Sequence, residues 1–319
     1  MKKFTEKVVK KAKELGADLV GIAPVERWAN APIKLSPQGL LPGSKSVIVV
    51  AIHHPDACVE LGGHPSLHDL GPYEIQAIMN EKLDFISFRL ARFLEDCGYK
   101  SLPTVSSRII RFRPFEGRPE GFTPEISHIH AGACAGLGEI GFSGLLITPE
   151  YGPRVRLVSV ITEAELEPTP LYRGVPLCDK CMECVKHCPT EAFRKEVREI
   201  AVIKIEDRVF KYPKKNMWRC CWAEGFALSL ELPIPDKVDE KVILEFLNKY
   251  GPYKGEIGGC LKYCLPPKLR DEKRPFQRKK EKVRISKNKL VEKIVSMAKG
   301  NYVDYLEVLS PEEVKKWGI

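Results

Sequence analysis

The sequence has no run of about 18 apolar residues, the length that a membrane-spanning helix requires. It begins MKKFTEKVVKKAKEL, which lacks the uncharged apolar segment of a secretory signal peptide. The HExxH pattern of helical zinc sites is absent as well. The first two absences argue against a membrane-spanning or secreted protein, and we expect a cytoplasmic one. The third argues against a zinc site of that type.

Cysteine, by contrast, is abundant. The 319 residues include 11 cysteines, and 44% hydrophobic with 29% charged residues is the composition of an ordinary globular protein. A chain of this length forms one large domain or roughly two to three smaller ones. In a reducing compartment cysteines serve as ligands or free thiols rather than disulfides. Cys58, Cys97 and Cys134 are scattered, whereas the other eight fall between Cys178 and Cys264.

The densest cysteine pattern is CDKCMECVKHCP, residues 178–189. It has the spacing CxxCxxCxxxCP and contains Cys178, Cys181, Cys184 and Cys188. A structural zinc site usually pairs two CxxC units across a longer gap, and a disulfide framework is typical of a small secreted chain. The spacing therefore favours an iron–sulfur cluster and one-electron transfer.

Four further cysteines follow this motif. Cys220 and Cys221 are adjacent, and Cys260 and Cys264 lie in CLKYCLPP, which resembles CxxxCP with one residue inserted before the proline. In two-cluster ferredoxins the fourth cysteine of each motif binds the other cluster. We therefore predict one cluster on Cys178, Cys181, Cys184 and Cys264, and a second on Cys188, Cys220, Cys221 and Cys260. Adjacent helical side chains diverge by about 100°, so Cys220 and Cys221 reach one cluster only if the backbone turns there.

Apolar periodicity predicts the main elements of the fold. Helices are expected at 4–15, 73–97, 190–193, 218–232 and 290–298, with another from Pro311. Strands are expected at 19–23, 47–52, 106–112, 145–148, 155–162 and 199–205. The acidic, proline-bearing segment 163–176 predicts a domain boundary before the cysteine motif.

Residues 134–144 (CAGLGEIGFSG) contain four glycines. Such density requires either sharp turns or a close approach to the backbone. A cofactor that contacts the loop explains it, and so does tight packing between elements.

The segment from Lys268 to Lys289 carries eleven Lys or Arg residues against three acidic ones, although the whole chain has a net charge of only +9. A basic stretch of this kind binds RNA phosphates or an acidic electron donor, and it is equally typical of a solvated linker.

These motifs give the chain a resemblance to the family of epoxyqueuosine reductases and reductive dehalogenases, from about residue 1 to 267. The similar segments are GADLVGIA, LPGSKSVIVVA, AGLGEIGFSGLLITPEYGPRVRL and the cysteine motifs. The resemblance implies an α/β (α+β) fold, with a nitroreductase-like corrinoid-binding core followed by a bacterial two-cluster ferredoxin-like domain. It implies an α/β cofactor and substrate domain over 1–165, a ferredoxin-like 2×[4Fe–4S] domain over 166–268, and a basic linker with a helical tail over 269–319.

The resemblance also implies site residues. Two [4Fe–4S] clusters would pass electrons to base-off cobalamin, which supplies the difficult chemistry. The expected cofactor contacts are Gly136, Gly138, Gly141, Tyr151, Gly152 and Arg154. The expected proton donors are Glu120, Glu125 and Tyr73.

Two positions depart from the family pattern. Epoxyqueuosine reductases have a lysine where this chain has Phe142, so Arg154 or Arg113 would have to supply the cation. Their second cysteine set includes a lone cysteine at the position of Ile257, which leaves one ligand of the second cluster open.

Three functions remain possible from the sequence. The first is a reductase that acts on an organic substrate and takes electrons from a small ferredoxin or flavodoxin-like donor. The second is an electron-transfer protein with another organic cofactor or with none. The third is a tRNA-modifying reductase that uses residues 268–289 to bind tRNA.

Overall fold

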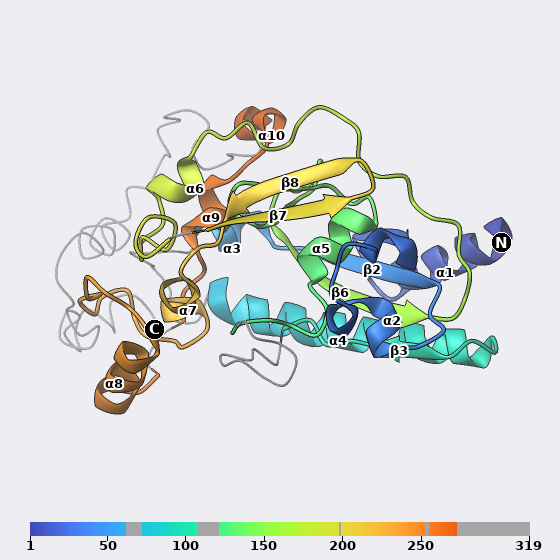
Figure 1. The fold of residues 1–319 in the computed structure, drawn as a ribbon, viewed down its shortest axis with the longest axis horizontal. Helices are drawn as coiled ribbons and strands as arrows, with labels where there is room; N and C mark the ends of the chain where they lie inside the picture. The colour runs from blue at the N-terminus through green and yellow to red at the C-terminus, as the bar shows by residue number, and fades with distance from the viewer. Residues whose placement is uncertain (62–71, 108–120, 198, 253–254, 273–319) are drawn as a thin grey trace, which may run out of the picture. The chain divides into compact units, whose positions relative to one another are not determined.

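The computed structural model describes residues 1–61, 72–107, 121–197, 199–252 and 255–272 (Figure 1). The chain divides into two compact units, Met1–Lys273 and Arg274–Ile319. The second unit lies outside the described residues, as do the helices predicted after residue 289. The domain boundary predicted near residue 165 stays a prediction.

A four-stranded antiparallel sheet organises the first unit. Its order is β1 (Leu19–Pro24), β2 (Ser46–His53), β6 (Val155–Thr162) and β3 (Ser101–Pro103). The central strand β2 is buried along almost its whole length, which explains its unbroken run of β-branched residues. The strands predicted at 19–23, 47–52 and 155–162 are confirmed. The short edge strand β3 was not predicted, and the strand expected at 106–112 lies largely outside the described residues.

Two helices cover one face of this sheet. In α1 (Lys2–Glu14) and α4 (Pro72–Asp96), apolar residues such as Val8, Ile86 and Leu90 are fully buried against Ile48 and Val160. Figure 1 shows α4 running along the sheet. Both helices match the predicted ranges to within two residues, because each has a strong apolar periodicity.

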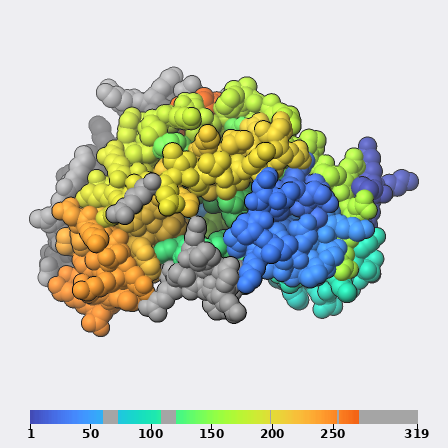
Figure 2. Space-filling view, in the orientation of Figure 1, coloured from blue at the N-terminus to red at the C-terminus, as the bar shows by residue number. Residues whose placement is uncertain are grey.

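The other face packs against α5 (His128–Cys134) and a hairpin of β7 (Ile200–Ile205) and β8 (Arg208–Pro213). Ile205 and Phe210 of this hairpin share one core with Val49 and Ala131. The hairpin follows the cysteine motif in the chain, and Figure 2 shows its atoms, in yellow, at the surface. The cysteine-rich region is thus anchored on the N-terminal sheet by apolar contacts.

Shorter elements complete the described chain. They are η1 (Val25–Trp28), η2 (Ile33–Leu35), α2 (Pro37–Leu40), α3 (Asp56–Leu61), β4 (Glu139–Ile140), β5 (Leu146–Ile147), α6 (Glu183–Lys186), α7 (Met217–Glu224), α8 (Glu240–Tyr250), α9 (Gly259–Tyr263) and α10 (Pro267–Glu272). Within the described ranges, no helix is both long and apolar enough to span a membrane.

One predicted helix is wrong and another is too long, for related reasons. Residues 190–193 form turns, and Glu191 has a left-handed backbone with φ of 54°. The helix expected over 218–232 ends as α7 at Glu224, and Ala227 has φ of 50°. A left-handed non-glycine residue cannot continue a right-handed helix.

Candidate functional site

Four of the predicted ligands, Cys178, Cys181, Cys184 and Cys264, lie close together; we call them the first cysteine set. Burial, and then the negative charges of Cys178 and Cys181, raise the pKa of Cys184 to about 11. Burial also raises the pKa of Cys264, and Cys184, Cys260, Cys178 and Cys181 raise it further. The thiols are therefore near enough to repel one another when ionised.

The loop that carries three of these thiols has an unusual backbone. Lys180 and Met182 both have left-handed φ angles, 57° and 63°. These turns reverse the chain between successive cysteines and let it wrap around a small volume. The backbone N–H of Phe142 donates to Cys178 Sγ at 3.3 Å, so the loop also packs against residues 134–144.

Helix α9 brings Cys264 to this loop. A Cβ on Gly259 would lie 2.2 Å from the His187 carbonyl oxygen, so only glycine permits this approach of α9 to the end of α6. The rings of His187 and Tyr263 stack with their centroids 3.8 Å apart. Arg270 in α10 donates two hydrogen bonds of 2.7 Å to the Asp179 carboxylate. These contacts hold α9 and α10, and therefore Cys264, against the loop that carries Cys178, Cys181 and Cys184.

A second cysteine set consists of Cys188, Cys220 and Cys260. Burial raises the pKa of Cys260 to about 12; Lys215 opposes this rise, whereas Cys220 and Cys188 add to it. The backbone N–H of Ala192 donates to Cys188 Sγ at 3.4 Å. Cys260 also raises the pKa of Cys264, so the two sets adjoin, and their assignment to two clusters stays a prediction.

Cys221 is less closely associated with this second set. It is buried, and among the cysteines only the charge of neighbouring Cys220 adds to the rise in its pKa that burial produces. Helix α7 continues through both residues, so the backbone does not turn as a shared cluster requires. Ile257, at the position of the family's additional cysteine, is 2% exposed and packs with Val59 and Leu261. The assignment of Cys221 to the second cluster stays a prediction.

No group of three or more His, Cys, Asp or Glu side chains in the described ranges is arranged to hold a single metal ion. The cysteine thiols are instead near enough to raise one another's pKa, and Cys264 is affected by Cys260 as well as by Cys178, Cys181 and Cys184.

Lys215 lies beside the second cysteine set and was missed in the sequence. Its Nζ donates to the Ser143 carbonyl oxygen at 3.3 Å, and its positive charge opposes the rise that burial produces in the pKa of Cys220. Burial lowers the pKa of Lys215, but Cys220, Cys260 and Glu224 raise it well above its ordinary value. The sequence does not distinguish Lys215 from the adjacent Lys214, which forms an ion pair of 2.8 Å with Glu199 on the surface.

The glycines of residues 134–144 face atoms of the protein itself. A Cβ on Gly136 would lie 2.1 Å from the Pro170 carbonyl oxygen, and one on Gly138 would lie 2.0 Å from that of Ile147. A Cβ on Gly141 would lie 2.3 Å from Ile147 Cδ1. Tight packing therefore explains these three glycines, and their contact with a cofactor stays a prediction.

The other predicted cofactor contacts are also packed within the protein. Gly152 has φ of 60°, and a Cβ there would lie 2.9 Å from Pro266 Cδ. Tyr151 is half-buried and its ring stacks on His53 at 4.2 Å.

Arg154 is 1% exposed, and its guanidinium is surrounded by protein acceptors. It pairs with Glu60 and, at 2.9 Å, with Asp56. It also donates to the carbonyl oxygens of Leu261 at 3.3 Å and Lys262 at 3.0 Å, both in α9. These contacts leave it poorly placed to replace the lysine missing at position 142. The contacts of Arg154 instead fix α9, which contains Cys260 and ends just before Cys264. Arg113, the other proposed replacement, lies outside the described residues.

Tyr73, one of the predicted proton donors, contacts α7, the helix that carries Cys220. Its hydroxyl donates to the Glu224 carbonyl oxygen at 2.5 Å, and its pKa is raised by burial and then by Glu224, Glu74 and other charges that include Cys221. Glu125 is exposed, and Glu120 lies outside the described residues.

Arg156 lies near Tyr73, and His54 lies near Arg156. Arg156 pairs with Glu224 at 3.6 Å and binds the Gln76 side-chain oxygen. His54 is fully buried, and neither ring nitrogen has a hydrogen-bond partner in the described structure. Burial, and then Arg156, lower the pKa of His54 to about 3, so the ring is neutral. A buried polar side chain without a partner is a common feature of ligand sites.

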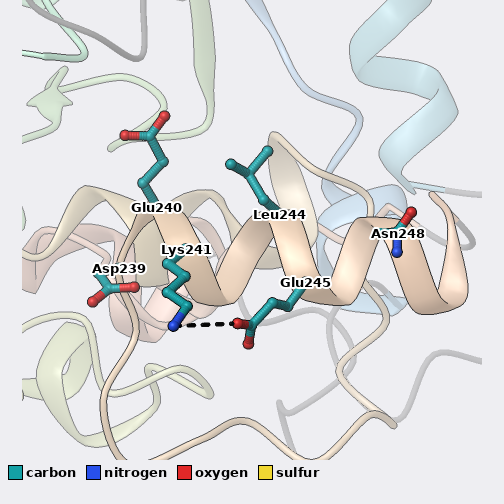
Figure 3. A pocket seen from close by; sticks show the side chains of 6 residues that line it. All are labelled: Asp239, Glu240, Lys241, Leu244, Glu245 and Asn248. Carbon is teal, nitrogen blue, oxygen red and sulfur yellow. Dashed lines mark ion pairs between the residues drawn. The ribbon is translucent and has the colours of Figure 1, made fainter.

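A depression beside α8 lies elsewhere. It is lined by Asp239, Glu240, Lys241, Leu244, Glu245 and Asn248, as Figure 3 shows. Lys241 and Glu245 form an ordinary ion pair of 3.8 Å one helical turn apart. Among the described residues, no cysteine and no predicted proton donor lines this depression, so we do not place the functional site there.

The chain is homologous to reductive dehalogenases and epoxyqueuosine reductases, which are oxidoreductases, so the resemblance seen in the sequence is confirmed. The tetrachloroethene reductive dehalogenase of Desulfitobacterium hafniense is 32% identical over 246 residues, which cover 68% of this chain and 43% of that protein. The epoxyqueuosine reductase of Gloeobacter violaceus is 30% identical over 57% of this chain and 51% of that protein. This chain therefore spans about half the length of these relatives or less. No protein-family model matches it.

The fold is also similar to solved structures. A variant of the catabolic reductive dehalogenase NpRdhA superposes with a TM-score of 0.50 at 18% identity, over 71% of this chain and 30% of that one. This similarity supports a shared mixed α/β fold with small antiparallel sheets. The nitroreductase-like and ferredoxin-like composition of the fold stays a prediction.

Substitution of Arg154 should show that this residue supports the fold. Arg154→Met leaves Glu60 buried without its cation, so we expect the loss of about 3–5 kcal/mol of unfolding free energy. The measurement is urea unfolding of the purified protein. The matched control is Arg173→Met, which removes an exposed pair with Asp207 and should leave the midpoint near that of the wild type. Equal midpoints for the two variants would contradict this role.

Proposed function

We propose that the protein is an iron–sulfur reductase that passes electrons through two [4Fe–4S] clusters to a corrinoid centre and reduces an organic substrate. The main supporting observation is that seven cysteines from distant parts of the chain lie near enough to raise one another's pKa. Homology to two groups of reductases supports the same reaction class.

The residues of the first cysteine set fit a cubane cluster. Four thiols are present, and each would bind a different iron rather than converge on a single ion. The Phe142 N–H that donates to Cys178 Sγ is the type of contact that stabilises a cluster sulfur. For the second set, Cys188, Cys220 and Cys260 supply three ligands, and we assign the fourth to Cys221, which requires α7 to open at its start when the cluster binds.

When bound, the clusters supply one-electron transfer and the corrinoid supplies a strongly reducing cobalt centre. The chain would supply the proton for reductive cleavage, and Tyr73 is the best-placed donor because it lies in a polar group beside the second cysteine set. Arg156 and buried His54 lie close together, and the two ring nitrogens of His54, which have no hydrogen-bond partner in the described structure, favour this region as the place where substrate binds. The electron donor would be a small ferredoxin or flavodoxin-like protein.

We expect the anaerobically purified protein to contain about eight iron atoms per chain, four in each cubane. Cys264→Ser removes a ligand of the first cluster and should reduce the iron content by about half. Cys97→Ser changes a cysteine outside both sets and should leave the iron content unchanged. Stoichiometric zinc with little iron would refute the proposal.

The corrinoid can be tested by reconstitution. We expect cobalamin added under anaerobic conditions to bind and to show the absorption bands of the base-off form. Flavin added in parallel serves as the control and should not bind. Binding of flavin without binding of cobalamin would instead favour an electron-transfer protein with a different organic cofactor.

A second candidate function is reduction of a modified nucleoside in tRNA. The basic segment from Lys268 to Lys289 favours it, and so does homology to epoxyqueuosine reductases.

Binding of tRNA should depend on this basic segment. Substitution of Lys279, Lys280 and Lys282 by glutamine should weaken the binding and flatten its salt dependence, because fewer counterions are released. The control replaces Lys2, Lys3 and Lys10 of α1, which removes the same charge elsewhere. Both can be measured by titration at several salt concentrations. Equal affinity for the two variants would argue against this function.

A further inference from the structure

The hairpin of β7 and β8 has one side that packs on the core and one side that is exposed. Along each strand, side chains alternate between these two sides, and cross-strand partners share a side. On the exposed side lie Ile200, Val202 and Lys204 of β7, with Val209 and Lys211 of β8. We call these five residues the outer face. Its three apolar side chains are 52–66% exposed, and Figure 2 shows the hairpin, in yellow, at the surface.

The outer face also carries positive charge that the rest of the hairpin does not neutralise. Lys204 and Lys211 form no ion pair with any of the described residues. The acidic residues that adjoin the two strands are already paired with other cations: Glu199 with Lys214 at 2.8 Å, Glu206 with Arg27 at 2.7 Å, and Asp207 with Arg173 at 2.8 Å. Exposed apolar side chains next to unbalanced cations fit a partner protein with an apolar patch and acidic side chains around it.

The packed side of the hairpin contacts the loop next to the first cysteine set. A Cβ on Gly144 would lie 3.1 Å from Tyr212 Cδ2, so β8 packs directly on this loop. Two residues earlier, the backbone N–H of Phe142 donates to Cys178 Sγ at 3.3 Å. A protein bound to the outer face is therefore joined to the first cysteine set by a short series of direct contacts.

We propose that the outer face is the docking site of the electron donor, and that this donor is an acidic protein of the ferredoxin class. The proposal rests on the proposed function, because it requires a reducible cluster in the first cysteine set. In the docked pair one electron leaves the reduced donor and enters that cluster, and no bond is made or broken. A second copy of this chain fits less well, since a symmetric contact would bring the same lysines together.

The test is stopped-flow reduction of the full-length, cluster-loaded protein by a reduced, acidic 2×[4Fe–4S] ferredoxin. We expect Lys204→Glu/Lys211→Glu to slow the reduction by about tenfold or more at low salt, because attraction becomes repulsion. Val202→Asp places a negative charge among the apolar side chains and should slow it as well. The matched control is Lys2→Glu/Lys3→Glu, which makes the same change of charge on α1, across the main sheet, and should leave the rate unchanged.

Reduction by dithionite, a small reductant that needs no docking site, separates this proposal from the function on which it rests. Dithionite should reduce the clusters of every variant to the same extent, and failure to reduce any cluster in the wild type would overturn both. If dithionite reduces the clusters, the docking proposal alone fails when ferredoxin does not reduce the wild type, or when it reduces Lys204→Glu/Lys211→Glu as fast. Conversion of a dimer to a monomer by Val202→Asp, with an unchanged ferredoxin reaction, would assign the outer face to a second copy instead.

Discussion

The position of α9 is the constraint on which both cysteine sets depend. This short helix carries Cys260 at its start and ends next to Cys264, so it contributes one thiol to each set. Arg154, the residue before β6, donates hydrogen bonds to two carbonyl groups of α9. Gly259 allows α9 to approach the cysteine loop at His187. A shift of this helix would therefore disturb the two sets together. The N-terminal sheet thus acts as the support for cysteines that come from much later in the chain.

The same support explains why buried charge is tolerated around Arg154. An isolated buried guanidinium is costly, but two carboxylates from α3 and two carbonyl groups from α9 satisfy most of its N–H groups. Arg219 in α7 is bound in a similar way by Glu196 and by the carbonyl groups of Thr190, Pro235 and Asp236. One arginine therefore fixes α9, and the other fixes the start of the helix that carries Cys220. Specific hydrogen bonds, rather than apolar area alone, set the relative positions of the cysteines.

Much of this arrangement could be predicted from the sequence, and the failures have physical causes. Strong periodicity located α1, α4 and the long strands, because burial of one face determines them. The turns at Glu191 and Ala227 could not be predicted, because the sequence does not show which residues other than glycine adopt a left-handed backbone. The glycines of 134–144 correctly indicated a close approach, but the sequence does not reveal that Pro170 and Ile147 are the approaching groups. Lys215 and Lys214 are likewise identical in the sequence and differ only in what surrounds them.

The loop of the first cysteine set is also fixed by a pair of charged side chains. Arg270 in α10 donates two hydrogen bonds of 2.7 Å to the carboxylate of Asp179, and these bonds are the main cause of the lowered pKa of Asp179, about 2. Asp179 lies between Cys178 and Cys181, so the pair joins α10 to the cysteine loop. A partly exposed ion pair adds little to the free energy of unfolding, so its main effect is to fix the position of the loop relative to α10.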